Sequence, residues 1–411
     1  MSSDKLCKIL KEQVADLKAR NVSKGTELVI TGVKNAEGKK GPRYFVEGFG
    51  NKEFLKMNSN SYLGLSLRKD MIEAEESAAK KFGVGPGAVR FISGTYAIHL
   101  ELEKKLAAFH KKEAGMIFSA AYVASMSVIV PLTTKDTIIV SDELNHNCII
   151  NAIRLSRPLD KSIYKHNNMN DLEAQIKSFV GKGKRMLVIT DGVFSMRGDN
   201  VPMAEFVKIC KKYENEFEEG IITIADDSHG VGAFGNTGRG TEEYTNSTVD
   251  LLIGTLGKAF GVNGGYVVGP TAILQYFRET SPMYIYSNPI TTSESAAALK
   301  ALEILDSPEG LSILKHLRAL TKKFRDGLVE IGFETLPGEH PVVPLMVRDT
   351  KKTSDIVRHL TENGILATGL NYPVVPKGDE EIRFQISGDH TAEDIDFALS
   401  ILKSYKTSEK K

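Results

Sequence analysis

The chain has 411 residues, which is long enough for a large core and, by size alone, for two or more domains. Its 53 Lys and Arg residues nearly balance its 52 Asp and Glu residues, so we expect no nucleic acid and no anionic membrane as a partner, whereas small zwitterionic ligands are compatible. The three cysteines form no Cys-x-x-Cys motif, and neither a secretory signal nor a membrane-length apolar segment is evident, so we expect a cytoplasmic protein.

Residues 1–57 form a first segment. Apolar side chains at helical spacing predict an amphipathic helix over residues 4–20, and its apolar stripe needs a surface to pack on, in this chain or in a partner subunit. Glycines and charged residues between 32 and 50 predict turns, and short strands are expected at 44–46 and 53–55.

Strands and helices alternate through residues 58–290. Apolar runs predict strands at 115–118, 137–142, 162–164, 185–191, 221–226 and on both sides of Lys258, and helical periodicity predicts helices at 69–82, 98–109, 125–132, 171–180, 203–213 and 271–279. A glycine-rich linker is expected at 83–95. The alternation predicts an α/β fold with a mainly parallel sheet that is covered on both faces.

Two turns that follow strands could bind a ligand. Ser119-Ala120-Ala121-Tyr122 places small residues between a strand and a helix, where a phosphate can approach backbone N–H groups. His146 comes just after the next strand, and it either stacks on an aromatic ligand or caps a loop.

Asp226 and His229 stand at the carboxyl end of the apolar strand 221–226, which is where open α/β sheets bind ligands. An Asp-x-x-His pair could bind a metal, but no further histidine or cysteine cluster lies nearby, so we expect no metal. A pyridine cofactor needs a carboxylate on its ring nitrogen, which strengthens its capacity to accept electrons. The pair therefore favours pyridoxal 5′-phosphate (PLP) over a metal.

Lys258 lies between two apolar runs and is bracketed by glycines. A surface loop lysine is one interpretation, and a Schiff base with PLP, which needs a partly desolvated amine, is the other. A phosphate-binding P-loop is excluded because Ala259 follows the lysine, where that motif requires Ser or Thr. Together with Asp226 and His229, the lysine favours the PLP interpretation.

Residues 291–411 have a different pattern, which predicts a smaller α+β domain. Long helices are expected at 293–305 and 310–331, strands at 342–347, 364–368 and 381–386, and further helices at 354–363 and 391–404. Arg383 lies on the last of these strands. It could hold a substrate carboxylate through two hydrogen bonds, or form a structural salt bridge.

From about residue 58 to its end, the chain resembles the α-oxoamine synthase family of fold-type I PLP enzymes. The resemblance rests jointly on Asn60-Ser-Tyr62-Leu-Gly64, Arg90-Phe-Ile-Ser-Gly94-Thr95, Asp142-x-x-Asn145-His146, Asp191-Gly-Val-Phe-Ser195, Asp226-Asp-Ser-His229, Gly238-Arg-Gly240 and Thr255-Leu-Gly-Lys258. Residues 372–378, Arg383-x-Gln385 and His390-Thr391 are most similar to the glycine C-acetyltransferases of this family.

The resemblance implies a role for each residue of a shared site. Lys258 would bind PLP and later move the substrate α-proton, Asp226 would pair with the pyridine nitrogen, and His229 would bind the phenolic oxygen. The remaining expected contacts are His146 stacked on the ring, Ser195 near the phenolic oxygen, Thr255, Ala121 and Tyr122 at the phosphate, Ser287 and Asn288 at the phosphate of the other subunit, and Asn60 and Arg383 at the amino-acid carboxylate. A homodimer with shared active sites follows.

The expected reaction is the condensation of glycine with acetyl-CoA to give 2-amino-3-oxobutanoate and CoA. The alternative is a relative with another amino acid or acyl-CoA, such as 8-amino-7-oxononanoate synthase or serine palmitoyltransferase. The turn 119–125 lacks the Cys-Phe-Asp-Ala-Asn expected of the most similar glycine C-acetyltransferases, so the acyl specificity stays open. A catalytically silent partner-binding subunit and a generic aminotransferase are further hypotheses.

Overall fold

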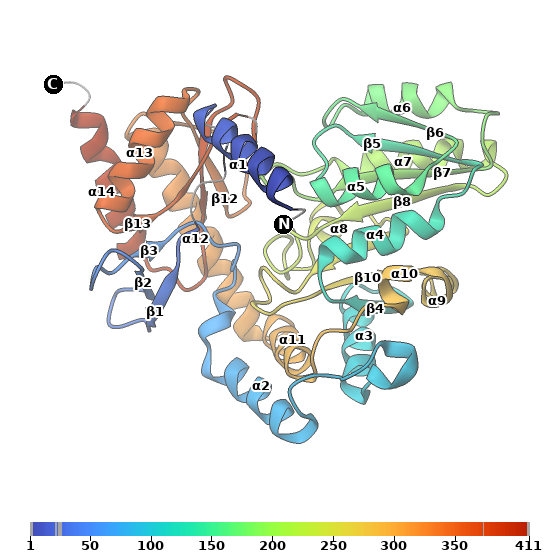
Figure 1. Ribbon diagram of the computed structural model, residues 1–411, viewed down its shortest axis with the longest axis horizontal. Coiled ribbons are helices and arrows are strands. Elements are labelled where there is room, and N and C mark those ends of the chain that lie inside the picture. The colour runs from blue at the N-terminus through green and yellow to red at the C-terminus, as the bar shows by residue number, and fades with distance from the viewer. Residues whose placement is uncertain (1–2, 21–22, 24–26, 373, 409–411) are drawn as a thin grey trace.

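The computed structural model describes residues 3–20, 23, 27–372 and 374–408 (Figure 1). Its largest sheet has seven strands in the order β4-β10-β9-β8-β7-β5-β6. These strands are β4 (Ala114–Phe118), β5 (Thr137–Asp142), β6 (Asp160–Tyr164), β7 (Arg185–Asp191), β8 (Ile221–Asp226), β9 (Leu251–Thr255) and β10 (Gly265–Gly269).

The sheet is parallel apart from β10, which pairs antiparallel with both β4 and β9. The central strands β7, β8 and β9 are almost entirely buried, as expected for strands covered on both faces. The predicted α/β fold with a mainly parallel sheet is therefore confirmed.

Alternate residues of the strands pack into two separate cores. Ile138 and Val140 of β5 belong to the core that contains residues of α3, α6 and α7, whereas Ile139 between them belongs to the core that contains residues of α4, α5 and α9. Successive side chains of a strand point to opposite faces, so each helix layer covers one face. These helices are α3 (Ala97–Phe109), α4 (Ala121–Leu132), α5 (Asn147–Ser156), α6 (Met169–Ser178), α7 (Met203–Tyr213) and α9 (Thr271–Thr280).

A smaller antiparallel sheet, in the order β11-β12-β15-β14, lies in the C-terminal part. It consists of β11 (Glu334–Thr335), β12 (Val342–Met346), β14 (Thr368–Leu370) and β15 (Glu381–Gln385), accompanied by α12 (Pro308–Glu330), α13 (Thr350–Glu362) and α14 (Ala392–Ser408). The helices α2 (Lys69–Phe82) and α11 (Thr292–Leu305) pack together, and α8 (Thr241–Thr245) follows β8. The predicted smaller domain thus has the expected α+β character.

The N-terminal strands lie beside this C-terminal part (Figure 1). They are β1 (Ile30–Lys34), β2 (Arg43–Val46) and β3 (Leu55–Lys56), and β3 pairs in parallel with β13 (Ile365–Leu366). A buried ion pair, 2.5 Å between Arg43 Nη2 and Asp394 Oδ1, adds a second link between these parts. The division of the chain at 57/58 and 290/291 stays a prediction.

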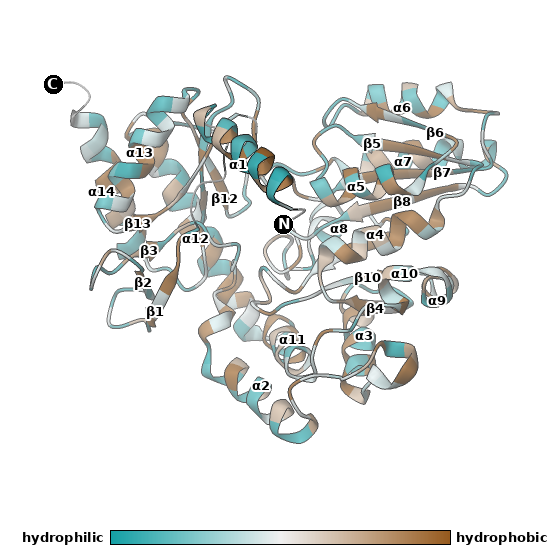
Figure 2. Ribbon diagram, in the orientation of Figure 1, coloured by the Kyte–Doolittle hydropathy of each residue, from teal (hydrophilic) through white to brown (hydrophobic). Residues whose placement is uncertain are grey.

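The predicted N-terminal helix is present as α1 (Asp4–Ala19). None of its residues, all of which the structure describes, is buried, and Figure 2 shows brown and teal residues along its surface. The exposed apolar side chains are Leu6, Ile9, Leu10, Val14 and Leu17. Among the described residues, no helix is long and apolar enough to cross a membrane.

Three local predictions differ from the structure. The helix expected to begin at 125 begins at Ala121 instead, so that residues 121–124, which were expected to form a turn, belong to its first turn. The expected irregular linker contains a π-helical turn over Arg90–Gly94, held by the buried ion pair of Arg90 Nη1 with Glu103 Oε1 (3.1 Å). The loop expected at 284–289 begins inside a short helix, α10 (Pro282–Ile285), which Pro282 opens at its first position.

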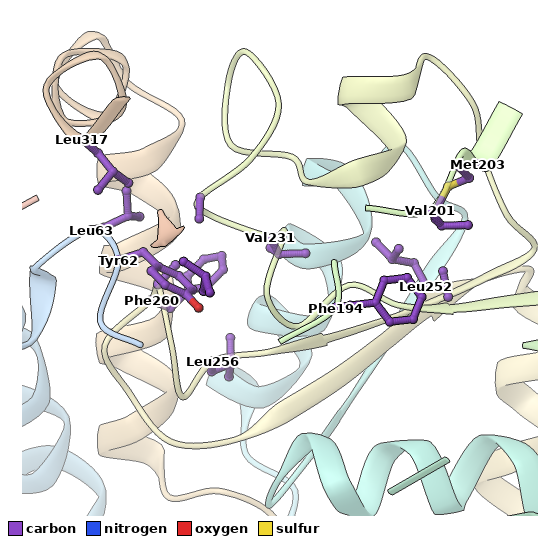
Figure 3. Packing of buried hydrophobic residues seen from close by; sticks show 14 of the residues in the cluster. Tyr62, Leu63, Phe194, Val201, Met203, Val231, Leu252, Leu256, Phe260 and Leu317 are labelled. Carbon is purple, nitrogen blue, oxygen red and sulfur yellow. The ribbon is translucent and has the colours of Figure 1, made fainter. Parts of the chain in front are cut away.

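The core continues from the large sheet to the C-terminal helices. Figure 3 shows Tyr62 and Leu63, which follow β3, together with Phe260 and with Leu317 of α12, and all four belong to one cluster of buried residues. The segment 60–64 therefore contributes to the packing between the two sheets.

Gly265 gives the first prediction, because β10 approaches the start of α4 very closely there. A Cβ at Gly265 would lie 2.3 Å from the backbone nitrogen of Ala121, so we expect Gly265→Ala to lower the free energy of unfolding by about 1–3 kcal/mol. Denaturant unfolding measures the change. Gly85→Ala is the control, since its Cβ would meet no described atom within 4 Å, and an equal loss in both variants would contradict the prediction.

Candidate active site

A cavity of about 230 Å³ opens at the carboxyl ends of the central strands. It brings together most of the predicted cofactor residues, which come from segments more than a hundred positions apart. Its lining residues are Ala121, Tyr122, His146, Cys148, Asp191, Val193, Asp226, Ser228, His229, Thr255 and Lys258.

Lys258 lies in the turn between β9 and β10, and its side chain faces this cavity. Burial lowers the pKa of its amine to about 8, although the carboxylates of Asp226 and Asp191 act in the opposite direction. An amine with this pKa is partly neutral near physiological pH, and the neutral amine is the nucleophilic form. Because Lys258 lines a cavity and burial lowers its pKa, it is not a surface loop lysine.

Asp226 is the last residue of β8, and three groups lie within hydrogen-bond distance of its carboxylate. The single proton of Ser125 Oγ is shared with the nearer Ala121 carbonyl (3.0 Å), and that of Cys148 Sγ with His146 Nδ1 (3.0 Å). The backbone N–H of Ser228 lies 3.1 Å from Oδ1, while Ser125 Oγ and Cys148 Sγ lie 3.3 and 3.6 Å from Oδ2. These contacts orient the carboxylate toward the cavity. Ser125 and Cys148 were not predicted as site residues.

Asp191 is a further residue that the sequence-based prediction missed. In the parallel register of β7 and β8 it pairs with Asp226, and its Oδ2 accepts from the backbone N–H of His146 at 3.1 Å. Burial, followed by the charge of Asp226, raises the pKa of Asp191 well above its ordinary value, while the charge of Lys258 opposes this shift. Its place at a strand end beside Asp226 was the signal that could have found it.

His146 caps a helix and lines the cavity at the same time. It is the N-cap of α5, and its Nδ1 accepts from the backbone N–H of Cys148 at 3.2 Å. Because burial lowers its pKa, the ring is neutral, and an accepting Nδ1 leaves the proton on Nε2. The capping interpretation of this histidine is therefore confirmed, and its stacking on a cofactor ring stays a prediction.

His229 is buried beside Tyr62, whose hydroxyl lies 2.7 Å from its Nδ1. Burial, with the charge of Lys258, lowers the pKa of His229 well below its ordinary value, so the ring is neutral. Its backbone carbonyl accepts from His340 Nε2 at 2.8 Å. Tyr62 was not predicted as a site residue, although it belongs to a motif that carried the resemblance.

The start of α4 offers backbone donors to a phosphate. Its N-cap residue Ala120 provides no side-chain cap, so the first N–H groups of the helix point toward the cavity wall formed by Ala121 and Tyr122. Thr255 Oγ1 lies close by, where it donates to the Gly264 carbonyl at 3.2 Å. A helix N-terminus with an adjacent hydroxyl suits an anion.

Arg383 and Asn60 lie next to the cavity rather than in its wall. Arg383 Nη1 donates to the backbone carbonyl of Ser195 at 3.1 Å, and its charge contributes to the lowered pKa of Lys258. Across the described ranges, no carboxylate forms a salt bridge with Arg383. Asn60 Oδ1 accepts from the Tyr62 hydroxyl at 3.3 Å.

Ser195, Ser287 and Asn288 do not line this cavity. Ser195 lines a second cavity, and Ser287 and Asn288 follow α10, where Asn288 is exposed. The expected contribution of Ser287 and Asn288 to the other subunit of a dimer stays a prediction.

The second cavity, of about 360 Å³, shares His146 with the first. Its walls come from the turns after β5 and β7 and from the C-terminal part. The lining residues are Glu143, Leu144, Asn145, His146, Asn147, Phe194, Ser195, Met196, Arg197, Met346, Val374, Val375, Pro376, Asp379 and Glu381.

The first cavity fits pyridoxal 5′-phosphate. It offers an amine at Lys258, a carboxylate at Asp226, an imidazole at His146 and open helix N–H groups. The buried hydroxyl of Ser228 has no hydrogen-bond partner within the described part of the chain, which leaves it free for a ligand. No group of three or more His, Cys, Asp and Glu side chains among the described residues could hold a metal ion.

The amine of Lys258 gives a direct test of this site. We expect Lys258→Ala to lose the visible absorbance of lysine-bound cofactor and to lose turnover, because no other amine lines the cavity among the described residues. An absorbance spectrum after dialysis against PLP measures the first effect. Lys322→Ala, which removes an exposed amine of α12, should keep both properties. An active Lys258→Ala enzyme would contradict the assignment.

Comparisons with known proteins agree with this geometry. Residues 52–402 match the family model described as aminotransferase class I and II. The chain is 42% identical to the 8-amino-7-oxononanoate synthase of Petrotoga mobilis over 91% of this chain and 92% of that protein. It is 39% identical to the protein of the same name from Thermosipho melanesiensis, over 90% and 92%.

Among solved structures, Sphingomonas wittichii serine palmitoyltransferase has the same fold, with a TM-score of 0.87 at 24% identity over 99% of this chain and 98% of that chain. The chain therefore belongs to the aminotransferase class I and II family and, within it, to the α-oxoamine synthases, which use pyridoxal 5′-phosphate to condense an amino acid with an acyl thioester.

Proposed function

We propose that this chain is an 8-amino-7-oxononanoate synthase, which condenses alanine with a pimeloyl thioester and releases the thiol and CO2. The observation that carries the proposal is that relatives of this name are 34–42% identical to the chain and align with at least 85% of it. The expectation from sequence put glycine and acetyl-CoA first, and these relatives favour its alternative instead.

The large second cavity supports an acyl group longer than acetyl. Its volume is about 360 Å³, and much of its wall is apolar, from Leu144, Phe194, Met196, Met346 and Val374. Apolar walls stabilise an aliphatic chain by removing it from water. The departure at residues 119–125 does not decide the acyl group in this proposal, because Ala121 and Tyr122 line the cofactor cavity.

When bound, PLP supplies an electron sink for the negative charge that develops on the amino-acid Cα. Asp226 and Lys258 are the two residues that would act on the cofactor and on the amino-acid α-proton. Asp226, whose carboxylate is oriented by its contacts with Ser228, Ser125 and Cys148, would pair with the ring nitrogen and favour its protonated form. Lys258 Nζ would hold the cofactor and would take the α-proton of the amino acid; its lowered pKa of about 8 suits a base at neutral pH.

Arg383 and His146 would orient the two substrates. The guanidinium of Arg383, which forms no salt bridge among the described residues, would bind the amino-acid carboxylate. His146 lies in both cavities, and its Nε2–H would donate to the thioester carbonyl oxygen while the Cα–C bond forms and the C–S bond breaks. Loss of CO2 from the alanine carboxylate then completes the α-oxoamine.

The glycine C-acetyltransferase reaction is the second candidate. It is favoured by the similarity of residues 372–378 and of Arg383-x-Gln385 to that group of enzymes, although Pro373 lies outside the described residues. Val374, Val375 and Pro376 of this segment line the second cavity. The segment therefore lies where it could affect acyl selection in either reaction.

A substrate grid separates the candidates. Release of CoA should be measured for acetyl-, pimeloyl- and palmitoyl-CoA, each with glycine, alanine and serine. We expect alanine with pimeloyl-CoA to give the highest kcat/KM, by roughly tenfold or more, because each methylene that fits an apolar pocket contributes to discrimination. A maximum for glycine with acetyl-CoA would assign the second candidate instead, and amino transfer without release of CoA would contradict both.

The role of Asp226 is tested by the exchange of a proton. We expect Asp226→Asn to keep bound cofactor but to slow the exchange of the alanine α-proton in deuterated water by roughly 10²-fold or more, because a neutral amide cannot hold the ring proton. Proton NMR of the alanine signal measures the rate. Asp326→Asn, on the exposed surface of α12, is the control. Unchanged exchange in Asp226→Asn would remove the assigned role.

A further inference from the structure

The wall of the second cavity combines apolar and polar side chains. Its apolar residues include Leu144 and Phe194, and it also contains Glu381, on which the charges of the lining residues Arg197 and Asp379 act. A cavity with this arrangement suits a chain that is aliphatic along its length and polar at its tip.

Glu381 is the most informative of these residues. It is only 2% exposed, and its Oε1 has no hydrogen-bond partner in the part of the chain that the structure describes. A buried polar atom without a partner costs free energy, so its presence in a cavity wall indicates a ligand atom that satisfies it.

The position of Glu381 on its strand links the cavity to the reaction site. Glu381 and Arg383 are two residues apart on β15, so their side chains leave the same face of the sheet. At a rise of about 3.3 Å per residue, their Cα atoms lie about 7 Å apart. If Arg383 holds the amino acid, Glu381 is placed further along the path of the acyl group.

We propose that Glu381 is a specificity-determining residue that donates a hydrogen bond to the distal carboxylate of the acyl donor. This inference rests on the proposed function, because the carbon skeleton of an 8-amino-7-oxononanoate carries a carboxylate at the end opposite the new ketone. The acyl donor must bring that carboxylate into the enzyme. Arg197, whose Nε pairs with Asp199 Oδ2 at 3.2 Å, lies in the same wall and would add a positive charge near that carboxylate.

The protonation state of Glu381 agrees with a donor. Burial raises the pKa of its carboxyl to about 8; the positive charges of Arg383 and Arg197 oppose this shift, and the negative charges of Asp379 and Asp199 add to it. Glu381 is therefore mostly protonated at pH 7, and a carboxyl group can then donate to a carboxylate oxygen. An ionised glutamate would repel the same ligand.

The test compares pimeloyl-CoA with heptanoyl-CoA, which has the same chain length and no distal carboxylate. We expect the wild-type enzyme to prefer pimeloyl-CoA in kcat/KM with alanine. Glu381→Leu should lower kcat/KM for pimeloyl-CoA about tenfold or more, since it removes a hydrogen bond to a charged group, and should not lower that for heptanoyl-CoA. Glu381→Gln should keep most of the preference, because its amide still donates.

The outcomes separate this inference from the proposed function. Turnover of pimeloyl-CoA with an unchanged preference in Glu381→Leu overturns the inference alone, whereas turnover of acetyl-CoA and not pimeloyl-CoA by the wild-type enzyme overturns both. Glu334→Gln, on the exposed end of the same sheet, is the matched control and should keep the wild-type preference.

The pH profile keeps the inference testable if Glu381→Leu does not fold. As the pH rises through about 8, Glu381 ionises in the free enzyme, so the preference for pimeloyl-CoA should fall while kcat/KM for heptanoyl-CoA does not fall with it. Glu381→Gln should abolish this difference between the two profiles. A preference that stays constant from pH 6.5 to about 9 in the wild-type enzyme would overturn the inference.

Discussion

The in-register parallel pairing of β7 with β8 is the constraint on which the site depends, because it places Asp191 directly beside Asp226. Two adjacent buried carboxylates cannot both be ionised at low cost. The two carboxylates have different surroundings: the backbone N–H of Ser228 donates to Asp226, whereas burial and the charge of Asp226 raise the pKa of Asp191 well above its ordinary value. One strand pair therefore places two carboxyl groups with different environments at the same edge of the cavity.

The antiparallel strand β10 completes the site from the other side. After Lys258 the chain turns back, so that Gly265 pairs with Thr255 and leaves no room for a Cβ against Ala121. This close approach brings the open start of α4 beside the hydroxyl of Thr255. The backbone positions of Lys258, Asp226 and the start of α4 are thus set by the strand register and by this close approach.

The sequence predicted the parts of this arrangement that depend on local pattern. The apolar strands, most helices and the convergence of Asp226, His229 and Lys258 on one cavity follow from periodicity and from residues at strand ends. Asp191, Cys148 and Tyr62 were missed as site residues because their relevance comes from strand register and from contacts across the chain. The acyl specificity was also not predictable, since Glu381 looks like any strand glutamate until its burial is known.

His146 connects the two halves of the proposed chemistry, because it lines both cavities. Its Nδ1 is occupied by the helix cap at Cys148, so the proton of the neutral ring lies on Nε2. A donor can polarise a thioester carbonyl, but it cannot remove a proton from the amino acid. In the proposed mechanism, the helix cap would therefore separate the roles: Lys258 would serve as the base, and His146 would serve as the donor on the acyl side.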